Sequence, residues 1–210
     1  MSRALDSLMG LSPVIPVLVI EEEAHAVPLA RALAAGGVRA LEVTLRTPVA
    51  LAAIRAIARE VPEATVGAGT VLNARDLEAA AQAGARFIVS PGLTPALAGA
   101  AVAARLPLLP GVATATEIMR GLDLGLTRFK FFPAETSGGA PALAAFAGPF
   151  AGCRFCPTGG ISAANAGQYL ALGNVACVGG SWLAPRETVR AGDWRRIEEI
   201  ARAAAGLRNG

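Results

Sequence analysis

The chain has 210 residues, of which 53% are hydrophobic and 17% are charged. This length allows one large domain or two small ones, and the apolar content excludes an intrinsically disordered protein. No clean run of about 20 strongly apolar residues could span a bilayer, so the composition also excludes an integral membrane protein. The formal net charge is only +3 and the arginines are spread along the chain, which gives no support for nucleic-acid binding.

Short apolar runs alternate with alanine-rich segments of helical period along the chain. In chain order, the predicted strands span residues 14–20, 40–45, 65–69, 86–89, 106–110, 127–131, 154–157 and 174–178. The predicted helices between them span residues 24–35, 48–60, 74–83, 95–104, 114–122, 141–146 and 162–172, and a C-terminal helix spans about 186–205. Helix-start signals are Thr47-Pro48, Asn73 and Thr94-Pro95, and helix-end signals are Gly36-Gly37, Gly84 and Gly173.

Eight strand–helix repeats without a linker predict one α/β domain over residues 1–210. The architecture that fits best is a parallel (β/α)8 TIM barrel with a short N-terminal extension and a C-terminal helix. A doubly wound sheet shows the same alternation and is the alternative. The barrel predicts that chemistry lies at the C-terminal ends of the strands and in the loops that follow them.

The sequence gives no sign of a secretion signal, a disulfide or a metal site. Pro13 and Pro16 interrupt the N-terminal apolar stretch, so we expect no signal peptide and a cytosolic protein. Cys153 and Cys156 form an isolated C-x-x-C motif, which we interpret as two buried structural thiols rather than a zinc or redox site. His25 is the only histidine, and a surface or helix-cap role fits it better than catalysis.

Lys130 is the only lysine among 19 basic residues, and it lies at the end of the sixth predicted strand. Strand alternation places it opposite Phe129 and Phe131, so it points into the barrel. Burial disfavours the charged ammonium and favours a free amine, which can form a Schiff base with a carbonyl substrate. The alternative is a structural lysine whose stem packs on phenylalanines while its amine reaches the barrel mouth.

The second predicted strand carries three polar side chains on one face, at Glu42, Thr44 and Arg46. A carboxylate near the lysine can shuttle protons, and an arginine can hold a substrate carboxylate with two hydrogen bonds. A purely structural Glu42–Arg46 ion pair is the alternative.

Three further loops follow strand ends. Gly67-Ala68-Gly69-Thr70 is a weak nucleotide motif, and we interpret its glycines as room for a small ligand with the Thr70 hydroxyl as donor. Thr158-Gly159-Gly160 and Gly179-Gly180-Ser181 follow the last two strands, where barrels commonly bind phosphate through backbone N–H groups. Plain turns are the alternative for these last two loops.

Taken together, these segments resemble the 2-keto-3-deoxy-6-phosphogluconate (KDPG) aldolase family, which overlaps with 4-hydroxy-2-oxoglutarate (KHG) aldolase. The resemblance runs from about residue 13 to the C-terminal helix and leaves only the first dozen residues outside it. It rests on the segments Leu-Glu-Val-Thr-Leu-Arg-Thr (41–47), Val-Gly-Ala-Gly-Thr-Val-Leu (66–72), Ser-Pro-Gly (90–92), Phe-Lys-Phe-Phe-Pro-Ala-Glu (129–135), Phe-Cys-Pro-Thr-Gly-Gly-Ile (155–161) and Gly-Gly-Ser-Trp-Leu (179–183).

The resemblance implies a metal-free class I aldolase that needs no cofactor beyond a covalent Schiff base on Lys130. It implies a homotrimer that cleaves a small anionic 2-keto acid to pyruvate and glyceraldehyde 3-phosphate, with no nucleic-acid or membrane partner. The residues that match the family's site are Lys130 for the Schiff base, Glu42 as general acid/base, Arg46 and Thr70 for the carboxylate, Pro91 and Phe132 lining the pocket, Thr158 near the substrate hydroxyls, and Gly160, Gly180 and Ser181 for the phosphate. Gly159 and Gly179 complete the predicted phosphate site as members of the same glycine loops.

Two alternatives stay open. The same chemistry could serve KHG, giving pyruvate and glyoxylate, either instead of KDPG or beside it. A non-catalytic phosphate-binding barrel with a structural lysine is the more remote one. Phe-Lys-Phe-Phe with Pro-Thr-Gly-Gly favours the gluconate substrate over its galactonate epimer.

Overall fold

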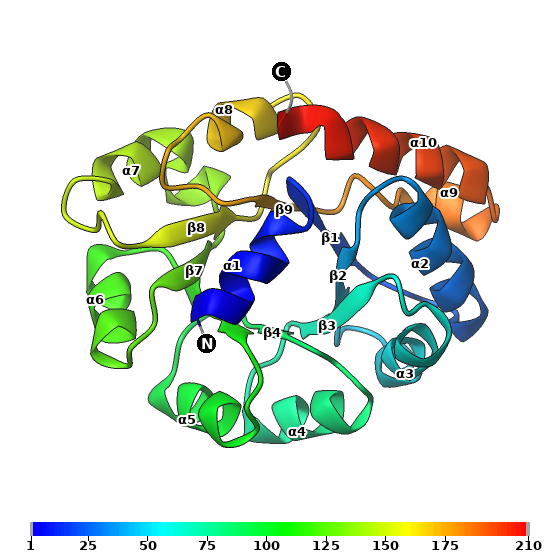
Figure 1. The fold of residues 1–210 in the computed structure, drawn as a ribbon, viewed down its shortest axis with the longest axis horizontal. Helices are drawn as coiled ribbons and strands as arrows, with labels where there is room; N and C mark the ends of the chain where they lie inside the picture. Colours follow the sequence, from blue (N-terminus) through cyan, green and yellow to red (C-terminus); the bar gives the residue numbers. More distant parts are fainter. Residues whose placement is uncertain (1, 209–210) are drawn as a thin grey trace.

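The computed structural model describes residues 2–208 and shows parallel strands with helices outside them (Figure 1). The strands are β1 (Val14–Leu18), β2 (Ala40–Thr44), β3 (Thr65–Gly69), β4 (Ile88–Val89), β5 (Leu108–Leu109), β6 (Gly111–Val112), β7 (Arg128–Phe131), β8 (Arg154–Pro157) and β9 (Val178–Gly180). The α-helices are α1 (Ser2–Gly10), α2 (Ala26–Ala35), α3 (Ala50–Glu60), α4 (Ala74–Gln82), α5 (Pro95–Ala103), α6 (Ala115–Asp123), α7 (Gly139–Phe146), α8 (Ala166–Leu170), α9 (Arg186–Arg190) and α10 (Trp194–Ala205), and the 3-10 turns are η1 (Glu23–His25), η2 (Glu135–Ser137) and η3 (Gly206–Arg208).

The strands form two parallel sheets, with the orders β5-β4-β3-β2-β1-β9 and β6-β7-β8. The prediction of an α/β fold with parallel strands is therefore confirmed, although the hydrogen-bonded sheet is not one continuous set of eight strands. The fifth predicted strand, 106–110, is shortened to β5, and β6 follows it in the other sheet after Pro110, which has no N–H to donate to a ladder. At the other end of each sheet, isolated bridges connect β8 with the segment that contains β9, between Phe155 and Val175 and between Thr158 and Gly179.

Local sequence explains most helix boundaries. The Asn73 side chain accepts a hydrogen bond from the Asp76 N–H, and the Thr94 hydroxyl accepts one from the Leu97 N–H, so both predicted N-caps are confirmed. Thr47 is not a cap: α3 begins at Ala50, and the Thr47 hydroxyl donates to the Ile20 carbonyl at 2.6 Å.

Three elements in the C-terminal part of the chain differ most from the prediction. The C-terminal helix is two helices, because Gly192 adopts a φ of 67° and Asp193 caps a new helix at Trp194. The helix predicted over 162–172 is limited to α8. Strand β9 lies later than predicted, so Gly179 and Gly180 are strand residues rather than loop residues.

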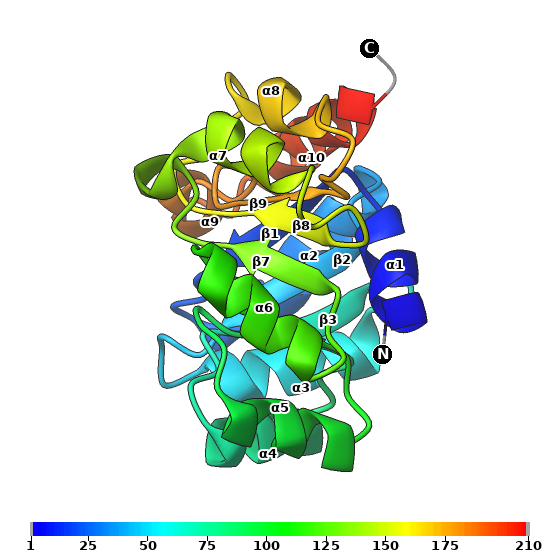
Figure 2. The ribbon, with the colours of Figure 1, turned by 90° about the vertical axis from the view of Figure 1, so that its left-hand side faces the viewer.

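Helix α1 covers the N-terminal ends of the strands, at the end of the molecule facing the viewer in Figure 1 and on the right in Figure 2. Leu5, Leu8 and Met9 are buried there in an apolar cluster with Phe87 and Leu109. The predicted N-terminal extension is therefore a helix whose buried side chains belong to the apolar core.

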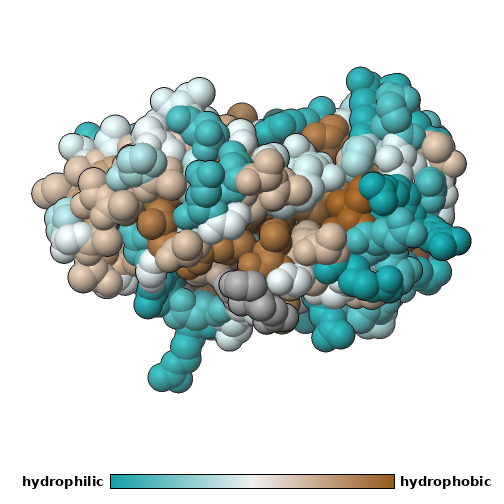
Figure 3. Space-filling view, turned by 90° about the horizontal axis from the view of Figure 1, so that it is seen from above, coloured by the Kyte–Doolittle hydropathy of each residue, from teal (hydrophilic) through white to brown (hydrophobic). Residues whose placement is uncertain are grey.

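A second and larger apolar layer lies between the strands and the surrounding helices. The face that carries α8 and α10 exposes apolar groups between polar ones (Figure 3), in a shallow groove lined by Ala163, Trp182, Ile200, Ala204 and Leu207. No helix within residues 2–208 is both long and apolar enough to cross a membrane.

Candidate active site

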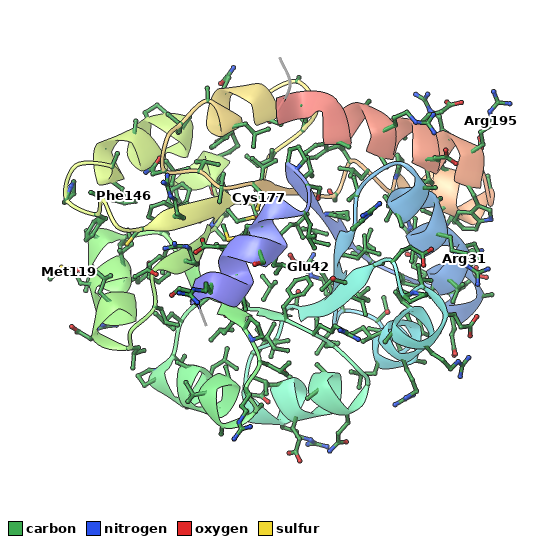
Figure 4. The ribbon with its side chains drawn as sticks, viewed as in Figure 1. Arg31, Glu42, Met119, Phe146, Cys177 and Arg195 are labelled. Atoms are coloured by element: carbon green, nitrogen blue, oxygen red, sulfur yellow. The ribbon has the colours of Figure 1, made fainter. Side chains whose placement is uncertain are left out.

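Lys130 and Glu42 form a buried ion pair between two strands of different sheets. Strand β7 supplies Lys130 and β2 supplies Glu42, whose side chain points toward the interior (Figure 4). The Lys130 Nζ donates to Glu42 Oε1 at 3.2 Å, and only 6% and 4% of the two side chains are exposed. Buried charges persist only when they are paired, and the hydrogen bond between these two is also a direct path for a proton.

An aromatic ring lies beside the same amine. The Lys130 Nζ is 5.3 Å from the centre of the Phe132 ring, within the range of a cation–π contact. The site therefore offers one amine, one carboxylate and an aromatic wall, and Lys130 is buried as the strand pattern predicted.

The glycines of β3 make room for protein side chains rather than for a ligand. A Cβ atom at Gly69 would overlap the Glu42 carboxylate, and one at Gly67 would overlap the Phe87 ring. The interpretation of these glycines as ligand space is therefore wrong. Gly69 instead permits Glu42 to lie flat against the neighbouring strand.

Arg46 and Thr70 meet at the rim above this pair. The Arg46 Nε donates to the Thr70 hydroxyl at 3.1 Å, and Thr70 has a left-handed φ of 58°. Such strained non-glycine residues cluster at functional sites. Thr44, predicted to share the inward face, is fully buried and donates to the Leu18 carbonyl at 2.9 Å, so it is not presented to a ligand.

A cavity of about 150 Å³ brings most of the predicted residues together. It is lined by Val17, Arg46, Lys130, Phe132, Thr158, Gly159, Gly160, Ile161, Gly180 and Ser181. Two of these, Val17 and Ile161, have no chemical signature in the sequence, although strand alternation could have placed Val17 on the inner face. A larger cavity of about 480 Å³ adjoins it, sharing Val17 and Ser181, and includes His25 in its wall.

The loop after β8 leaves two backbone N–H groups without a protein acceptor at residues that line the cavity. The carbonyls of Gly159 and Gly160 accept hydrogen bonds from the Glu135 N–H at 3.1 Å and the Asn165 Nδ2 at 3.0 Å. In a planar trans peptide the carbonyl and the following N–H point in opposite directions, so the N–H groups of Gly160 and Ile161 face away from these partners. Within residues 2–208, neither N–H has an acceptor in the protein.

The two glycines of β9 have different surroundings. A Cβ at Gly180 would overlap the Trp182 ring, so the tryptophan supports this residue from outside the cavity. A Cβ at Gly179 would overlap the Thr158 side chain, so Gly179 makes room for Thr158 and does not line the cavity itself. Pro91 is also outside the cavity wall, and its carbonyl lies against Gly111.

The remaining candidate groups do not line this cavity. Cys153 and Cys156 are buried, and burial raises the pKa of the Cys153 thiol, which disfavours the reactive thiolate. The His25 ring lies edge-on to Trp194 at 5.6 Å. No group of three or more His, Cys, Asp or Glu residues within 2–208 is arranged to hold a metal ion.

The comparisons with known proteins agree with this geometry. The model of the family described as KDPG and KHG aldolase matches residues 5–200. The chain belongs to this family. The match begins within α1, so the similarity to the family extends closer to the N-terminus than the predicted start at about residue 13.

Similar proteins cover nearly the whole chain. The KHG/KDPG aldolase of Escherichia coli K12 is 58% identical over 199 residues, which is 95% of this chain and 93% of the relative. The crystal structure of the Zymomonas mobilis ZM4 2-keto-3-deoxy-6-phosphogluconate aldolase with 3-phosphoglycerate has a TM-score of 0.94 and 55% identity, covering 99% of this chain and 97% of that one. The KDPG aldolase of Legionella pneumophila, with pyruvate captured as a covalent carbinolamine, has a TM-score of 0.93 and 48% identity over 95% and 97% of the two chains.

Proposed function

We propose that this chain is a class I aldolase that cleaves KDPG reversibly to pyruvate and glyceraldehyde 3-phosphate. The observation that carries the proposal is the buried Lys130–Glu42 pair, 3.2 Å apart, beside a cavity that also presents Arg46 and the N–H groups of a glycine loop. The Arg46 guanidinium, the Lys130 amine and the anion-binding glycine loop lie at one small cavity. This combination suits a keto acid that carries both a carboxylate and a phosphate.

The reaction begins when the Lys130 ammonium passes one proton to Glu42 and the neutral amine attacks the C2 carbonyl of the substrate. Its lone pair forms the N–C bond, the carbonyl π electrons move to oxygen, and that oxygen takes the proton that the nitrogen loses. Glu42 returns its proton to the new hydroxyl, which leaves as water, and the product is a protonated imine that withdraws electrons from C3. Glu42 accepts the proton of the C4 hydroxyl, through a water molecule, while the C3–C4 bond breaks and its electron pair forms an enamine. The aldehyde leaves, the enamine takes a proton at C3, and water hydrolyses the imine to pyruvate and free Lys130. The lysine supplies the electron sink, so the mechanism uses no external cofactor or metal.

The rest of the site holds the two anionic ends of the substrate. We assign the pyruvate carboxylate to Arg46 and Thr70, because their hydrogen bond orients the guanidinium at the rim. Phe132 forms a wall, Pro91 belongs to the loop next to that rim, and Thr158 faces the substrate hydroxyls.

We assign the phosphate to the N–H groups of Gly160 and Ile161 and to Gly180 and Ser181 at the end of β9, with Gly159 shaping the loop at a φ of 101°. Gly179 contributes by making room for Thr158.

We further propose that the two sheets make one closed (β/α)8 barrel. The bridge between Thr158 and Gly179 and the continuity of β5 with β6 support closure. The single domain over residues 1–210, which includes three residues outside the described part, the homotrimer and the cytosolic location are proposals that come from the sequence resemblance.

Trapping with borohydride tests the Schiff base directly. The protein is incubated with pyruvate and sodium borohydride, digested, and analysed by mass spectrometry, with Lys130→Arg as the matched control. A reduced pyruvyl adduct on Lys130 in the wild type, absent from the control, is the expected result. Folded wild-type protein without any adduct would refute the aldolase mechanism and favour a phosphate-binding barrel.

KHG is the second candidate substrate, since the similar E. coli protein carries both names. Ser181→Ala separates the two, because the Ser181 hydroxyl can contact only a substrate with a distal phosphate. We expect kcat/KM to fall about tenfold for KDPG, as for loss of a hydrogen bond to a charged group, and to stay unchanged for KHG. An equal fall for both substrates would contradict the phosphate assignment of Ser181.

A further inference from the structure

Glu135 and Tyr169 form a hydrogen-bonded pair behind the glycine loop, outside the cavity. Tyr169 lies on α8 with 1% of its surface exposed, and Glu135 begins η2. The Tyr169 hydroxyl donates to Glu135 Oε1. Burial, followed by this hydrogen bond, raises the pKa of Tyr169 well above its ordinary range, so the hydroxyl stays a donor. The mechanism above uses neither residue.

Glu135 contacts the glycine loop through both its backbone and its side chain. Its N–H donates to the Gly159 carbonyl at 3.1 Å, which helps to turn the next N–H toward the cavity. A Cβ atom at Gly160 would overlap the Glu135 Cγ and would lie 2.8 Å from the Glu135 Cβ. The aliphatic part of Glu135 is therefore the support on which Gly160 rests.

This support carries a negative charge close to the proposed phosphate position. Two anions near one loop repel each other, and the repulsion grows as the distance between them shrinks. The Tyr169 hydroxyl holds the carboxylate toward the start of α7, where Glu135 Oε1 is 3.8 Å from the position of a Cβ at Gly139. The uncharged Cγ and Cβ of Glu135 are the atoms nearest to a Cβ position at Gly160, and its carboxyl carbon is farther away, at 3.8 Å.

We propose that the Tyr169–Glu135 hydrogen bond is a positioning device that sets the enzyme's affinity for the phosphate of its substrate. Glu135 supports Gly160 with its aliphatic chain, and Tyr169 keeps the carboxylate away from the anion. Neither residue touches the reacting atoms. The inference rests on the proposed function, specifically on phosphate binding by the Gly160 loop.

The test compares Tyr169→Phe, Glu135→Gln and the double variant, with KDPG and KHG as paired substrates. We expect Tyr169→Phe to raise KM about tenfold for KDPG, as for loss of a hydrogen bond to a charged group, with little change in kcat. KM for KHG, which has no phosphate, stays at the wild-type value. The KDPG defect becomes smaller at high ionic strength, because the freed carboxylate lies at an exposed position where salt screens it.

The double variant identifies charge as the cause. Glu135→Gln keeps the aliphatic contact with Gly160 but removes the negative charge, so it leaves KM for KDPG near the wild-type value. In the Tyr169→Phe background the same change restores most of the lost affinity. A double variant as weak as Tyr169→Phe alone would overturn the charge argument, as would an equal rise in KM for KDPG and KHG.

Two measurements keep the test decisive. If Tyr169→Phe does not fold, Glu135→Ala replaces it: loss of the support under Gly160 should raise KM for KDPG alone, and an unchanged KM overturns the proposal. Borohydride trapping of pyruvate on Lys130 is carried out for every variant. Failure of trapping in the wild type contradicts the proposed function, whereas normal trapping without a KDPG-specific defect contradicts only this inference.

Discussion

Strand β7 carries two ion pairs, one at each end, and they differ in almost every physical respect. Near its start, Arg128 reaches Asp6 of α1, with an Nη2–Oδ2 distance of 2.9 Å and 16% and 45% of the two side chains exposed. Two residues later on the same strand face, Lys130 meets Glu42 with 6% and 4% exposed. The first pair is solvated and fastens a helix, whereas the second is enclosed beside the cavity.

The residues around the two ion pairs also differ between the two ends of β7. The α1 end is filled by apolar side chains, including Leu5, Leu8 and Phe87, and it contributes stability. The opposite end holds the polar groups that a reaction requires. The comparison indicates that stability and chemistry are separated along the strand axis, so variants at one end should leave the property of the other end unchanged.

The largest expected effect comes from Lys130→Arg. Arginine keeps a positive charge near Glu42 but cannot form an imine at neutral pH, so kcat should fall by at least about 10⁴-fold, as when a covalent nucleophile is removed. Steady-state cleavage of KDPG measures the loss, and circular dichroism verifies folding. Activity near that of the wild type would show that the buried Lys130–Glu42 pair, like the Arg128–Asp6 pair, is only structural.

Glu42→Gln removes the proton acceptor and keeps the shape of the side chain beside Gly69. We expect kcat to fall by about 10²–10⁴-fold, the usual contribution of general acid–base catalysis, with a smaller change in KM. Pyruvate trapping on Lys130 shows whether imine formation still occurs. A normal kcat would assign the proton transfers to another group.

Leu5→Ala tests the other end of the strands. Because Leu5 is 1% exposed in the cluster under α1, the free energy of unfolding should fall by about 2–5 kcal/mol. Urea denaturation measures the loss, and kcat per folded molecule should be unchanged. Leu122→Ala, at a position 40% exposed, is the matched control and should cost little. A large fall in kcat for folded Leu5→Ala would remove the separation of the two ends.

Asp6→Asn gives the smallest expected effect, with a sign that depends on pH. The hydrogen bond from Arg128 lowers the pKa of Asp6, so the pair stabilises the fold above the carboxyl's ordinary pKa of about 4. That stabilisation is lost as the pH falls through the lowered folded-state pKa. Because the pair is partly exposed, the variant should lose at most about 1 kcal/mol at pH 7.

Unfolding measured at pH 7 and again in acid should show the Asp6→Asn difference shrinking toward zero. A difference that persists unchanged in acid would mean that packing, and not the ion pair, fastens α1 to β7.

Hydrophobic periodicity predicted most strands and helices because burial of alternate residues is written into the local sequence. It did not predict α1, because residues 2–10 do not contain the side chains that their apolar face covers. Those side chains, Phe87 and Leu109, come from distant parts of the chain. It also placed the β9 glycines in a loop, because glycine is a turn signal locally and only pairing with β1 identifies a strand.

The site divides in the same way. The sequence by itself determined the family, the unusual lysine and the motifs at strand ends, because these depend on residue type and short-range spacing. Only the tertiary structure decided that Glu42 meets Lys130 across 88 residues, that Gly69 makes room for Glu42, and that Tyr169 holds Glu135 away from the glycine loop. The physical reason is that these contacts depend on the register and packing of distant segments, which local sequence patterns do not encode.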